Sequence, residues 1–349
     1  MLKILIAGDE IIKNEIIKEY VNKSLSTVDE SLEIITLEWT VRGYQKKKLQ
    51  DEGEIIEEFS GDPEKLIEHM NEVDILIVHT APVTSKVMDA SNRLKVIACL
   101  RGGPVNVNVK AATRRKIPVI YTPGRNARAV AEFTFGLILS LTRNIVRAHE
   151  RLRRGIWSEY HEMSGPELFE KTIGIIGFGH IGRLVASIAR GFGMKILVYD
   201  PYVEKSTISA LGYKLVELDT LLKESDIITI HARLTRETEK MIGEREFSLM
   251  KKTAYIINTS RGRIIDQRAL YKALKNRQIA GAALDVFEIE PLPPDDPLLS
   301  LENIVLTPHI AGSSTEVADR AAKMISEDLK RILTGGRPKY CINPEVLDL

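Results

Sequence analysis

Residues 171–200 read KTIGIIGFGHIGRLVASIARGFGMKILVYD and follow a strand–turn–helix–strand pattern. Residues 172–176 are mostly apolar and carry no charge, which is typical of a strand buried on both faces of a parallel sheet. Three glycines follow at fixed spacing. Gly177 permits a tight turn, Gly179 lets the backbone approach a pyrophosphate, and Gly182 lets the next helix pack closely on the strand. The pattern therefore predicts a dinucleotide-binding unit.

The rest of this stretch indicates which dinucleotide is bound. The amides of His180 and Ile181 at the helix start can hold the phosphate charge. A second strand over 196–199 ends at Asp200, roughly 20 residues after the loop, where a carboxylate accepts both ribose hydroxyls and repels a 2′-phosphate. A glycine triplet alone is a weak signal, but here strand, helix, second strand and acid coincide. We therefore expect NAD rather than NADP.

Length and composition limit the class of protein. At 349 residues the chain exceeds one core, so we expect two domains. A net charge of +1 gives no electrostatic case for nucleic acid or an anionic membrane as partner, and the basic segment 143–154 is read as a solvated helix face. The two cysteines show no metal-ligand spacing and favour a reducing cytoplasm. The longest apolar-rich stretch, 133–141, is far short of the ~20 residues that span a bilayer.

Apolar strand patterns alternate with charged, helix-like segments along the chain, at 2–7, 74–78, 95–100, 117–121, 226–230, 253–258, 280–287 and 304–306. This βα repeat predicts parallel sheets. No glycine series follows the first strand, so the nucleotide belongs to the second α/β unit. Residues 122–126, TPGRN, precede a helical pattern over 127–141 and are a candidate hinge. Ser313 and Glu316 form a capping-box pattern for a helix that runs to residue 333.

Functional side chains are expected just past the carboxyl ends of parallel strands, which singles out His231, Arg261, Glu290 and His309. A histidine that titrates near neutrality can give a proton to a carbonyl and take it back, as hydride transfer at carbon requires. His309, in LTPHIAG, is the first candidate for this role, and His231 is its rival.

Two further side chains complete a plausible reaction centre. A carboxylate beside the imidazole stabilises its charged form, and either Glu290 or Glu288 can supply it. The Arg261 guanidinium matches a substrate carboxylate in bidentate fashion, although a structural ion pair is an alternative. The sequence contains no Gly-x-Ser-x-Gly, His-Glu-x-x-His or paired Cys-x-x-Cys, which argues against serine-hydrolase and metal chemistry.

In order along the chain, GFGHIG, YDP, HARLT, NTSRGRIID, GAALDVFEIEPLP and TPHIAG resemble the motifs of the D-isomer-specific 2-hydroxyacid dehydrogenases, in their phosphoglycerate dehydrogenase-like and glyoxylate/hydroxypyruvate reductase-like branches. The resemblance implies an α/β fold of two Rossmann-like domains with parallel sheets. A dinucleotide-binding domain, 125–313, is inserted into a flavodoxin-like substrate domain, 1–124 with 314–349. It also implies an NAD-dependent enzyme acting on a small 2-hydroxy or 2-oxo acid, and a homodimer formed through the NAD-binding domain.

The resemblance assigns roles to single residues. It makes Arg261 the carboxylate ligand, His309 the acid/base and Glu290 its orienting acid, and it places His231 in the cofactor-lining strand end. Asp285 matches an aspartate that contacts the nicotinamide amide. The remaining residues of these motifs expected to contact the cofactor are Gly177, Gly179, His180, Ile181, Gly182, Asp200, Pro201, Ala232, Arg233, Thr238 and Thr259.

The sequence departs from the family pattern at RGGPVNVN, 101–108, where relatives commonly carry Gly-x-Gly-x-Asp-Asn-x-Asp. Gly102 and Gly103 can still present amides to the substrate carboxylate. Arg101 adds a cation that favours a second negative charge on the substrate, or else forms an ion pair within the protein. Arg233 and Arg128 are also unusual for the family, so the identity of the substrate stays open. An NAD(H)-sensing binding protein of the corepressor type is the alternative function, against which the near-zero net charge argues.

We predict that Asp200→Ala raises the use of NADPH relative to NADH, because the substitution removes the charge that repels a 2′-phosphate. The ratio of kcat/KM for the two cofactors measures the effect. Equal or better activity of the unaltered protein with NADPH would contradict the assignment.

Overall fold

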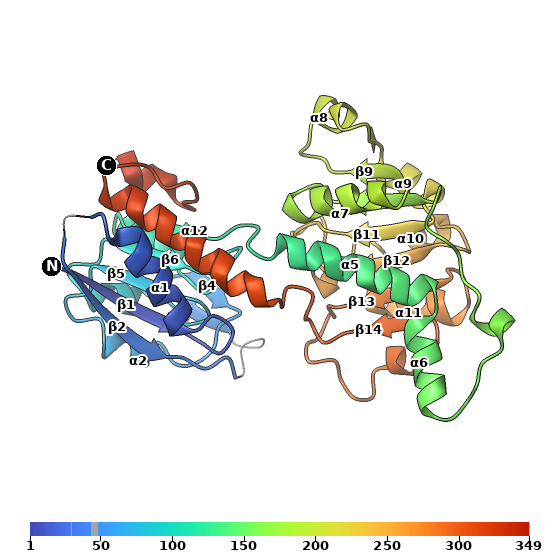
Figure 1. The fold of residues 1–349 in the computed structure, drawn as a ribbon, viewed down its shortest axis with the longest axis horizontal. Coiled ribbons are helices and arrows are strands. Elements are labelled where there is room, and N and C mark those ends of the chain that lie inside the picture. Colours follow the sequence, from blue (N-terminus) through green and yellow to red (C-terminus); the bar gives the residue numbers. More distant parts are fainter. Residues whose placement is uncertain (29, 43–47, 349) are drawn as a thin grey trace. The chain divides into compact units, whose positions relative to one another are not determined.

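The computed structural model describes residues 1–28, 30–42 and 48–348. The chain divides into two compact units, one made of Met1–Asn126 with Ser314–Leu349 and the other of Ala127–Ser313. The second unit is thus an insertion in the first, and the chain passes into it directly after the TPGRN segment. Figure 1 shows both as α/β structures.

The first unit contains a parallel five-stranded sheet in the order β2-β1-β5-β6-β7. Its strands are β1 (Leu2–Gly8), β2 (Leu32–Glu38), β5 (Ile75–Val78), β6 (Val96–Cys99) and β7 (Val119–Tyr121), and a separate antiparallel hairpin is formed by β3 (Lys48–Asp51) and β4 (Glu54–Glu57). Because the chain returns past β1 to place β5 on its other side, the strand order reverses between β1 and β5, as in flavodoxin-like sheets.

Helices cover both faces of this sheet. One face is covered by α1 (Asn14–Leu25) and α12 (Thr315–Leu333), which bury Ile17, Val21, Ala321 and Ile325 against the central strands. The other face is covered by α2 (Glu64–Ile67), α3 (Ser85–Asp89) and α4 (Val109–Arg114). The C-terminal segment runs alongside the edge strand β7, where Cys341 forms an isolated antiparallel bridge with Ile120, and it ends in η4 (Pro344–Asp348).

The second unit contains a parallel seven-stranded sheet in the order β10-β9-β8-β11-β12-β13-β14. The strands are β8 (Thr172–Ile176), β9 (Lys195–Tyr199), β10 (Lys214–Leu215), β11 (Ile227–Ile230), β12 (Tyr255–Asn258), β13 (Gly281–Leu284) and β14 (Ile304–Leu306). The order reverses between β8 and β11, which in doubly wound sheets is where a dinucleotide binds.

Two helical layers enclose this sheet as well. One layer has α5 (Ala127–Thr142), α7 (His180–Gly191) and α8 (Lys205–Ala210), and the other has α9 (Leu218–Glu224), α10 (Glu244–Leu249) and α11 (Gln267–Lys275). The short turns η2 (Gly262–Ile264) and η3 (Pro297–Ser300) pack into the second layer through the buried Ile264 and Leu298. Outside these layers lie α6 (Ile145–Arg153) and η1 (Tyr160–Met163), which have no buried residues. Since both faces of the sheet are covered, its central strands are buried throughout.

The structure corrects the sequence expectations at several points. The prediction of a capping box formed by Ser313 and Glu316 was wrong. Ser314 is the N-cap of α12, and its hydroxyl donates to the Glu316 carboxylate. The strand expected over 280–287 is shorter, and the chain leaves the sheet after Leu284. Among the described residues no single helix is long and apolar enough to cross a membrane, and one bent pair, α5 with α6, passes that test by length and composition only.

Candidate active site

The glycine turn after β8 has the geometry that the sequence predicts. Gly177 has a φ of +91°, and a Cβ there would lie 2.6 Å from the Ala232 nitrogen. At Gly182 a Cβ would lie 2.2 Å from the Gly177 carbonyl oxygen, so only glycine lets α7 approach the turn this closely. Gly179, the N-cap of α7, is open, because a Cβ there would meet nothing within 4 Å. The amides of His180 and Ile181 follow in the first turn of α7, where a phosphate is bound favourably.

Asp200 lies directly after β9, beside this turn. One carboxylate oxygen accepts from the Phe178 amide at 2.7 Å and the other from the Tyr202 amide at 2.9 Å. Both bonds hold the carboxylate at the edge of the glycine turn, and each oxygen retains a further lone pair for a ribose hydroxyl. Open turn, helix start and fixed acid together fit a bound NAD.

The other expected cofactor contacts are less uniform. Pro201 and Arg233 are exposed and Ala232 is half-buried beside Gly177. The Thr238 hydroxyl donates to the Arg233 carbonyl at 2.6 Å and so holds together the loop of residues 233–238. The Thr259 hydroxyl lies 3.1 Å from that of Thr134 in α5 and is buried.

His231 is held away from proton transfer. Its Nε2 lies 2.9 Å from the Thr229 hydroxyl, and its buried Nδ1 has no hydrogen-bond partner among the described residues. Burial lowers the pKa of His231 to about 3, so the ring stays neutral across the physiological range. The geometry therefore favours a cofactor-lining role over an acid/base role for this residue.

Arg261 follows β12 in a turn organised by Asn258. The buried Asn258 side chain accepts from the Ser260 amide and hydroxyl, each at 3.0 Å, and donates to the Arg261 carbonyl at 3.0 Å. A Cβ on Gly262 would lie 1.9 Å from the Phe287 carbonyl carbon. Because only glycine fits there, the Arg261 turn packs directly on the backbone that leads to Glu290.

Glu290 and His309 form the acid–imidazole pair. His309 Nδ1 lies 2.7 Å from one Glu290 carboxylate oxygen, and the other oxygen accepts from the Phe287 amide at 3.0 Å. Since a carboxylate only accepts, Nδ1 carries the proton and Nε2 is the nitrogen left for substrate chemistry. Glu288 points elsewhere, accepting from the Gln267 amide at 3.0 Å and lying 3.5 Å from Lys240.

The turn that carries His309 is held by Asp285. His309 has a φ of +55°, a left-handed conformation that is uncommon for residues other than glycine. The fully buried Asp285 carboxylate accepts from the Thr307 hydroxyl and from the amides of Ile310 and Ala311, at 2.6, 2.9 and 2.8 Å. These bonds surround His309 on both sides in sequence and stabilise its strained backbone.

Charge fixes the state of the pair. Burial alone would lower the pKa of His309, but the hydrogen bond and charge of Glu290 outweigh it and hold that pKa above its usual value. Burial would likewise raise the pKa of Glu290, and His309 outweighs this effect, so the carboxyl titrates below its usual range. The guanidinium of Arg261 lowers both pKa values as a smaller influence.

In the first unit, Gly102 and Gly103 follow β6 in an open loop, where a Cβ on Gly103 would meet nothing within 4 Å. Arg101 is 7% exposed and donates to the Glu58 carbonyl at 2.8 Å and to its carboxylate at 2.5 Å. The internal ion pair, left open by the sequence, is thus formed.

Comparison with known proteins agrees with this geometry. The family model "D-isomer specific 2-hydroxyacid dehydrogenase, NAD binding domain" matches residues 135–311. The chain is 44% identical to a glyoxylate reductase of Korarchaeum cryptofilum over 81% of this chain and 86% of the relative. The chain belongs to the D-isomer-specific 2-hydroxyacid dehydrogenase family. It is therefore an oxidoreductase of CH–OH donors, and its cofactor is NAD.

Other members of the family are named for different substrates. A D-3-phosphoglycerate dehydrogenase of Methanocaldococcus jannaschii is 42% identical over 85% of this chain but only 57% of the relative. The structure of a D-lactate dehydrogenase from Aquifex aeolicus, complexed with NAD and lactic acid, has a TM-score of 0.72 and 28% identity, covering 97% of this chain and 99% of that one. The two-domain α/β fold expected from the motifs is thereby confirmed.

Two positioning residues were missed or given another role by the sequence. Asn258 was read only as a strand end, although its place directly before the Ser-Arg-Gly turn is a usable signal for a turn-forming side chain. Asp285 was expected to contact the nicotinamide amide, which stays a prediction, and its hydrogen bonds to the His309 turn were not foreseen. Asp285 and the His309 turn meet only because β14 pairs with β13, and no local sequence pattern predicts this pairing.

We predict that Glu290→Gln moves the alkaline limb of the reduction pH profile to lower pH. Reduction requires the protonated imidazole, and its raised pKa depends on the charge of Glu290, so activity is lost at a lower pH once that charge is removed. The pH dependence of kcat with NADH measures the shift. Glu288→Gln in the same loop is the matched control and should leave the limb in place, and an unmoved limb in Glu290→Gln would disprove the pairing.

Proposed function

We propose that the protein reduces a small 2-oxo acid at C2 and, in reverse, oxidises the corresponding D-2-hydroxy acid. The observation that carries the proposal is the 2.7 Å pair between His309 and Glu290, in the unit that holds the glycine turn. The turn after Arg261 packs on the Phe287 backbone of the same unit. When bound, the nicotinamide supplies the hydride for reduction or accepts it in oxidation.

The residues of this chain handle the proton and the carboxylate. Protonated His309 donates from Nε2 to the carbonyl oxygen in reduction, and the neutral ring accepts the proton in oxidation. Glu290 keeps Nδ1 protonated and stabilises the imidazolium, as the carboxylate of a catalytic triad does. Arg261 binds the substrate carboxylate with its forked donors, and the amides of Gly102 and Gly103 add to this binding.

The substrate class is part of the proposal. Relatives named glyoxylate reductase and D-3-phosphoglycerate dehydrogenase match this chain at similar identity, so both a small acid and a phosphorylated one are candidates. Arg101 forms an ion pair with Glu58 in this arrangement, which is the second of the two roles considered for it.

The assembly and location are also proposed. Trp157 and Tyr160 are 80% and 91% exposed after α6, a helix without buried residues, which supports a homodimer formed through this unit. A cytoplasmic location is supported by the presence of only two cysteines, which are not disulfide-bonded.

We predict that the protein reduces at least one acid of a panel made of glyoxylate, hydroxypyruvate, phosphohydroxypyruvate, 2-oxoglutarate and pyruvate. The reaction is measured as the loss of NADH absorbance. Phosphohydroxypyruvate against hydroxypyruvate isolates the contribution of the phosphate. NADH binding without turnover of any acid would overturn the proposal and favour an NAD(H)-sensing protein.

We predict that Arg261→Lys lowers kcat/KM by about 10²-fold or more with the best acid, because lysine keeps the charge but loses the bidentate contact. Steady-state kinetics and an NADH titration by fluorescence measure the two effects, and the NADH affinity should barely change. An equal loss of cofactor affinity would make Arg261 a structural or cofactor-binding residue instead.

A further inference from the structure

The carboxyl ends of three neighbouring strands in the second sheet lie level with one another. Tyr199 of β9 pairs with Ile176 of β8, and Ile176 pairs with Ile230 of β11. The strand order reverses between β8 and β11, and a dinucleotide binds in the crevice at such a reversal. Tyr202 and Arg233 each lie three residues beyond this row, one after β9 and one after β11. The two residues therefore flank the glycine turn that follows β8.

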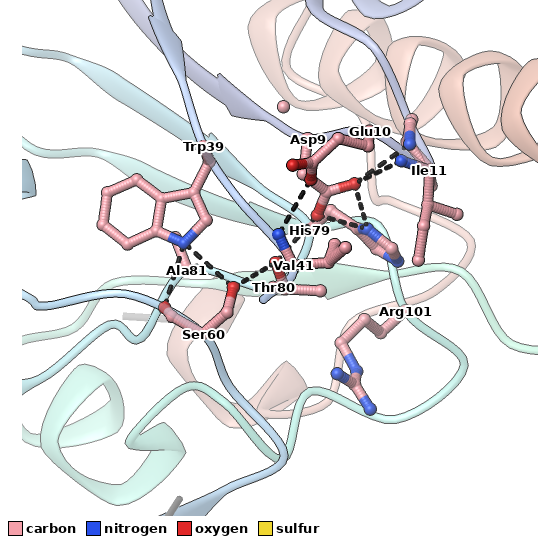
Figure 2. Close-up of polar contacts among 12 residues, drawn as sticks. Asp9, Glu10, Ile11, Trp39, Val41, Ser60, His79, Thr80, Ala81 and Arg101 are labelled. Atoms are coloured by element: carbon pink, nitrogen blue, oxygen red, sulfur yellow. Dashed lines mark hydrogen bonds and ion pairs between the residues drawn. The ribbon is translucent and has the colours of Figure 1, made fainter. Parts of the chain in front are cut away.

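The corresponding reversal in the first sheet, between β1 and β5, holds a buried pair instead. The Asp9 carboxylate there accepts from the Thr80 hydroxyl at 2.8 Å and lies 2.7 Å from His79 Nδ1, and Figure 2 shows the imidazole facing it. Asp9 and His79 are only 3% exposed, whereas Tyr202 and Arg233 are exposed. The second reversal thus presents side chains that a ligand can reach.

Tyr202 presents an aromatic ring beside the acid that is expected to bind the ribose. Its amide donates to the Asp200 carboxylate at 2.9 Å, and its side chain is 85% exposed. A lone exposed aromatic ring is ordinary on a protein surface, but the bond to Asp200 places this one next to the ribose site. The ring is therefore available to a flat group that is attached to the ribose.

Arg233 presents a guanidinium on the other side of the glycine turn. The nitrogen of Ala232 lies 2.6 Å from where a Cβ on Gly177 would be, so Arg233 begins as the chain leaves that turn. The Arg233 carbonyl accepts from the Thr238 hydroxyl at 2.6 Å, which holds the start of the loop. Within residues 1–28, 30–42 and 48–348, no hydrogen bond or ion pair engages the exposed guanidinium. The group is therefore free to contact a ligand.

The spacing of the strands suits a flat ring between these two side chains. Neighbouring strands lie about 4.8 Å apart, so the ends of β9 and β11, on either side of β8, are about 10 Å apart. A ring stacked on both faces needs about 7 Å, since each contact takes about 3.5 Å. Side chains that lean toward each other close the remaining distance. Aromatic rings and guanidinium groups both bind flat rings by their faces.

We propose that Tyr202 and Arg233 hold the adenine ring of the cofactor by its two faces, and that the protein recognises the base by stacking rather than by hydrogen bonds to its edge. NAD is the cofactor of this family, and Asp200 fits the ribose to which the adenine is attached. Stacking tolerates a change of base because every base has a π face. The protein therefore also accepts a dinucleotide in which hypoxanthine replaces adenine. The inference concerns the cofactor alone and does not depend on which acid is reduced.

Two substitutions remove one face of the clamp each. Tyr202→Ala and Arg233→Ala should each raise the Kd of NADH by about fivefold or more. Fluorescence titration of the full-length protein, without any 2-oxo acid, measures this effect. Tyr202→Phe keeps the ring and should stay within about twofold of the unaltered protein. Since both side chains are exposed, the Tm without cofactor should hardly change.

A charge control and two ligand fragments separate a contact with the base from a contact with the phosphates. Arg236→Ala removes another exposed arginine from the same loop and should leave the Kd of NADH unchanged. Arg233→Ala should raise the Kd of ADP-ribose, measured by displacement of NADH, as much as that of NADH, and leave the Kd of inorganic pyrophosphate unchanged. An equal loss for pyrophosphate, or an equal loss in Arg236→Ala, would trace the effect to charge and overturn the proposal.

Reduced nicotinamide hypoxanthine dinucleotide tests how the base is recognised. Its Kd should lie within about twofold of that of NADH in the unaltered protein and rise in parallel in Tyr202→Ala and Arg233→Ala. A Kd higher by about tenfold or more would show that the protein reads the edge of the adenine. That result, or an unchanged Kd of NADH in either alanine variant, would disprove the two-faced clamp.

Discussion

The five-stranded and the seven-stranded sheet are parallel and covered by helices on both faces, and this constraint decides where polar chemistry can occur. The interior of each sheet admits few groups that are not hydrogen-bonded, so functional side chains collect where strands end and loops begin. Gly177 and Asp285 directly follow strands of the second sheet, and Asn258 is the last residue of another. The first sheet repeats the arrangement with Asp9 and His79.

Two carboxylates divide the work of supporting one imidazole. Glu290 acts on the ring itself, through a 2.7 Å bond that favours the charged form. Asp285 acts on the backbone, binding the groups before and after His309 so that a left-handed residue is held in place. A similar division recurs in the first unit, where Asp9 orients His79 and Arg320 holds the backbone of Arg125. In both places a carboxylate fixes the orientation of an imidazole.

The sequence predicts those parts of the structure that depend on local spacing. The glycine turn, α7 and Asp200 form one continuous stretch, and each lies where the pattern places it. The strand-end rule also selected Glu290 and His309, which the structure brings together although they lie in separate loops. The hydrogen bonds between Asp285 and the His309 turn could not be predicted, because they depend on the register between β13 and β14.

Other differences have equally local causes. The strand β2 and the hairpin β3–β4 carry polar and charged side chains, so they lack the apolar run that revealed the central strands. The buried pair of Asp9 and His79 joins residues that follow two different strands, and no local pattern near either residue predicts that they are in contact. Arg101 had two possible roles, because the sequence alone does not show whether the partner of an arginine is a ligand or an internal carboxylate.

The insertion of one unit into the other affects how the protein is made. The second unit is one uninterrupted stretch of chain, Ala127–Ser313, while the first needs α12 to cover the face of its sheet beside α1. During synthesis from the N-terminus, the strands of the first sheet emerge early with that face still incomplete. The inserted unit can therefore finish folding on the ribosome before the domain that precedes it, because the early strands lack their last helix until Thr315–Leu333 has been synthesised.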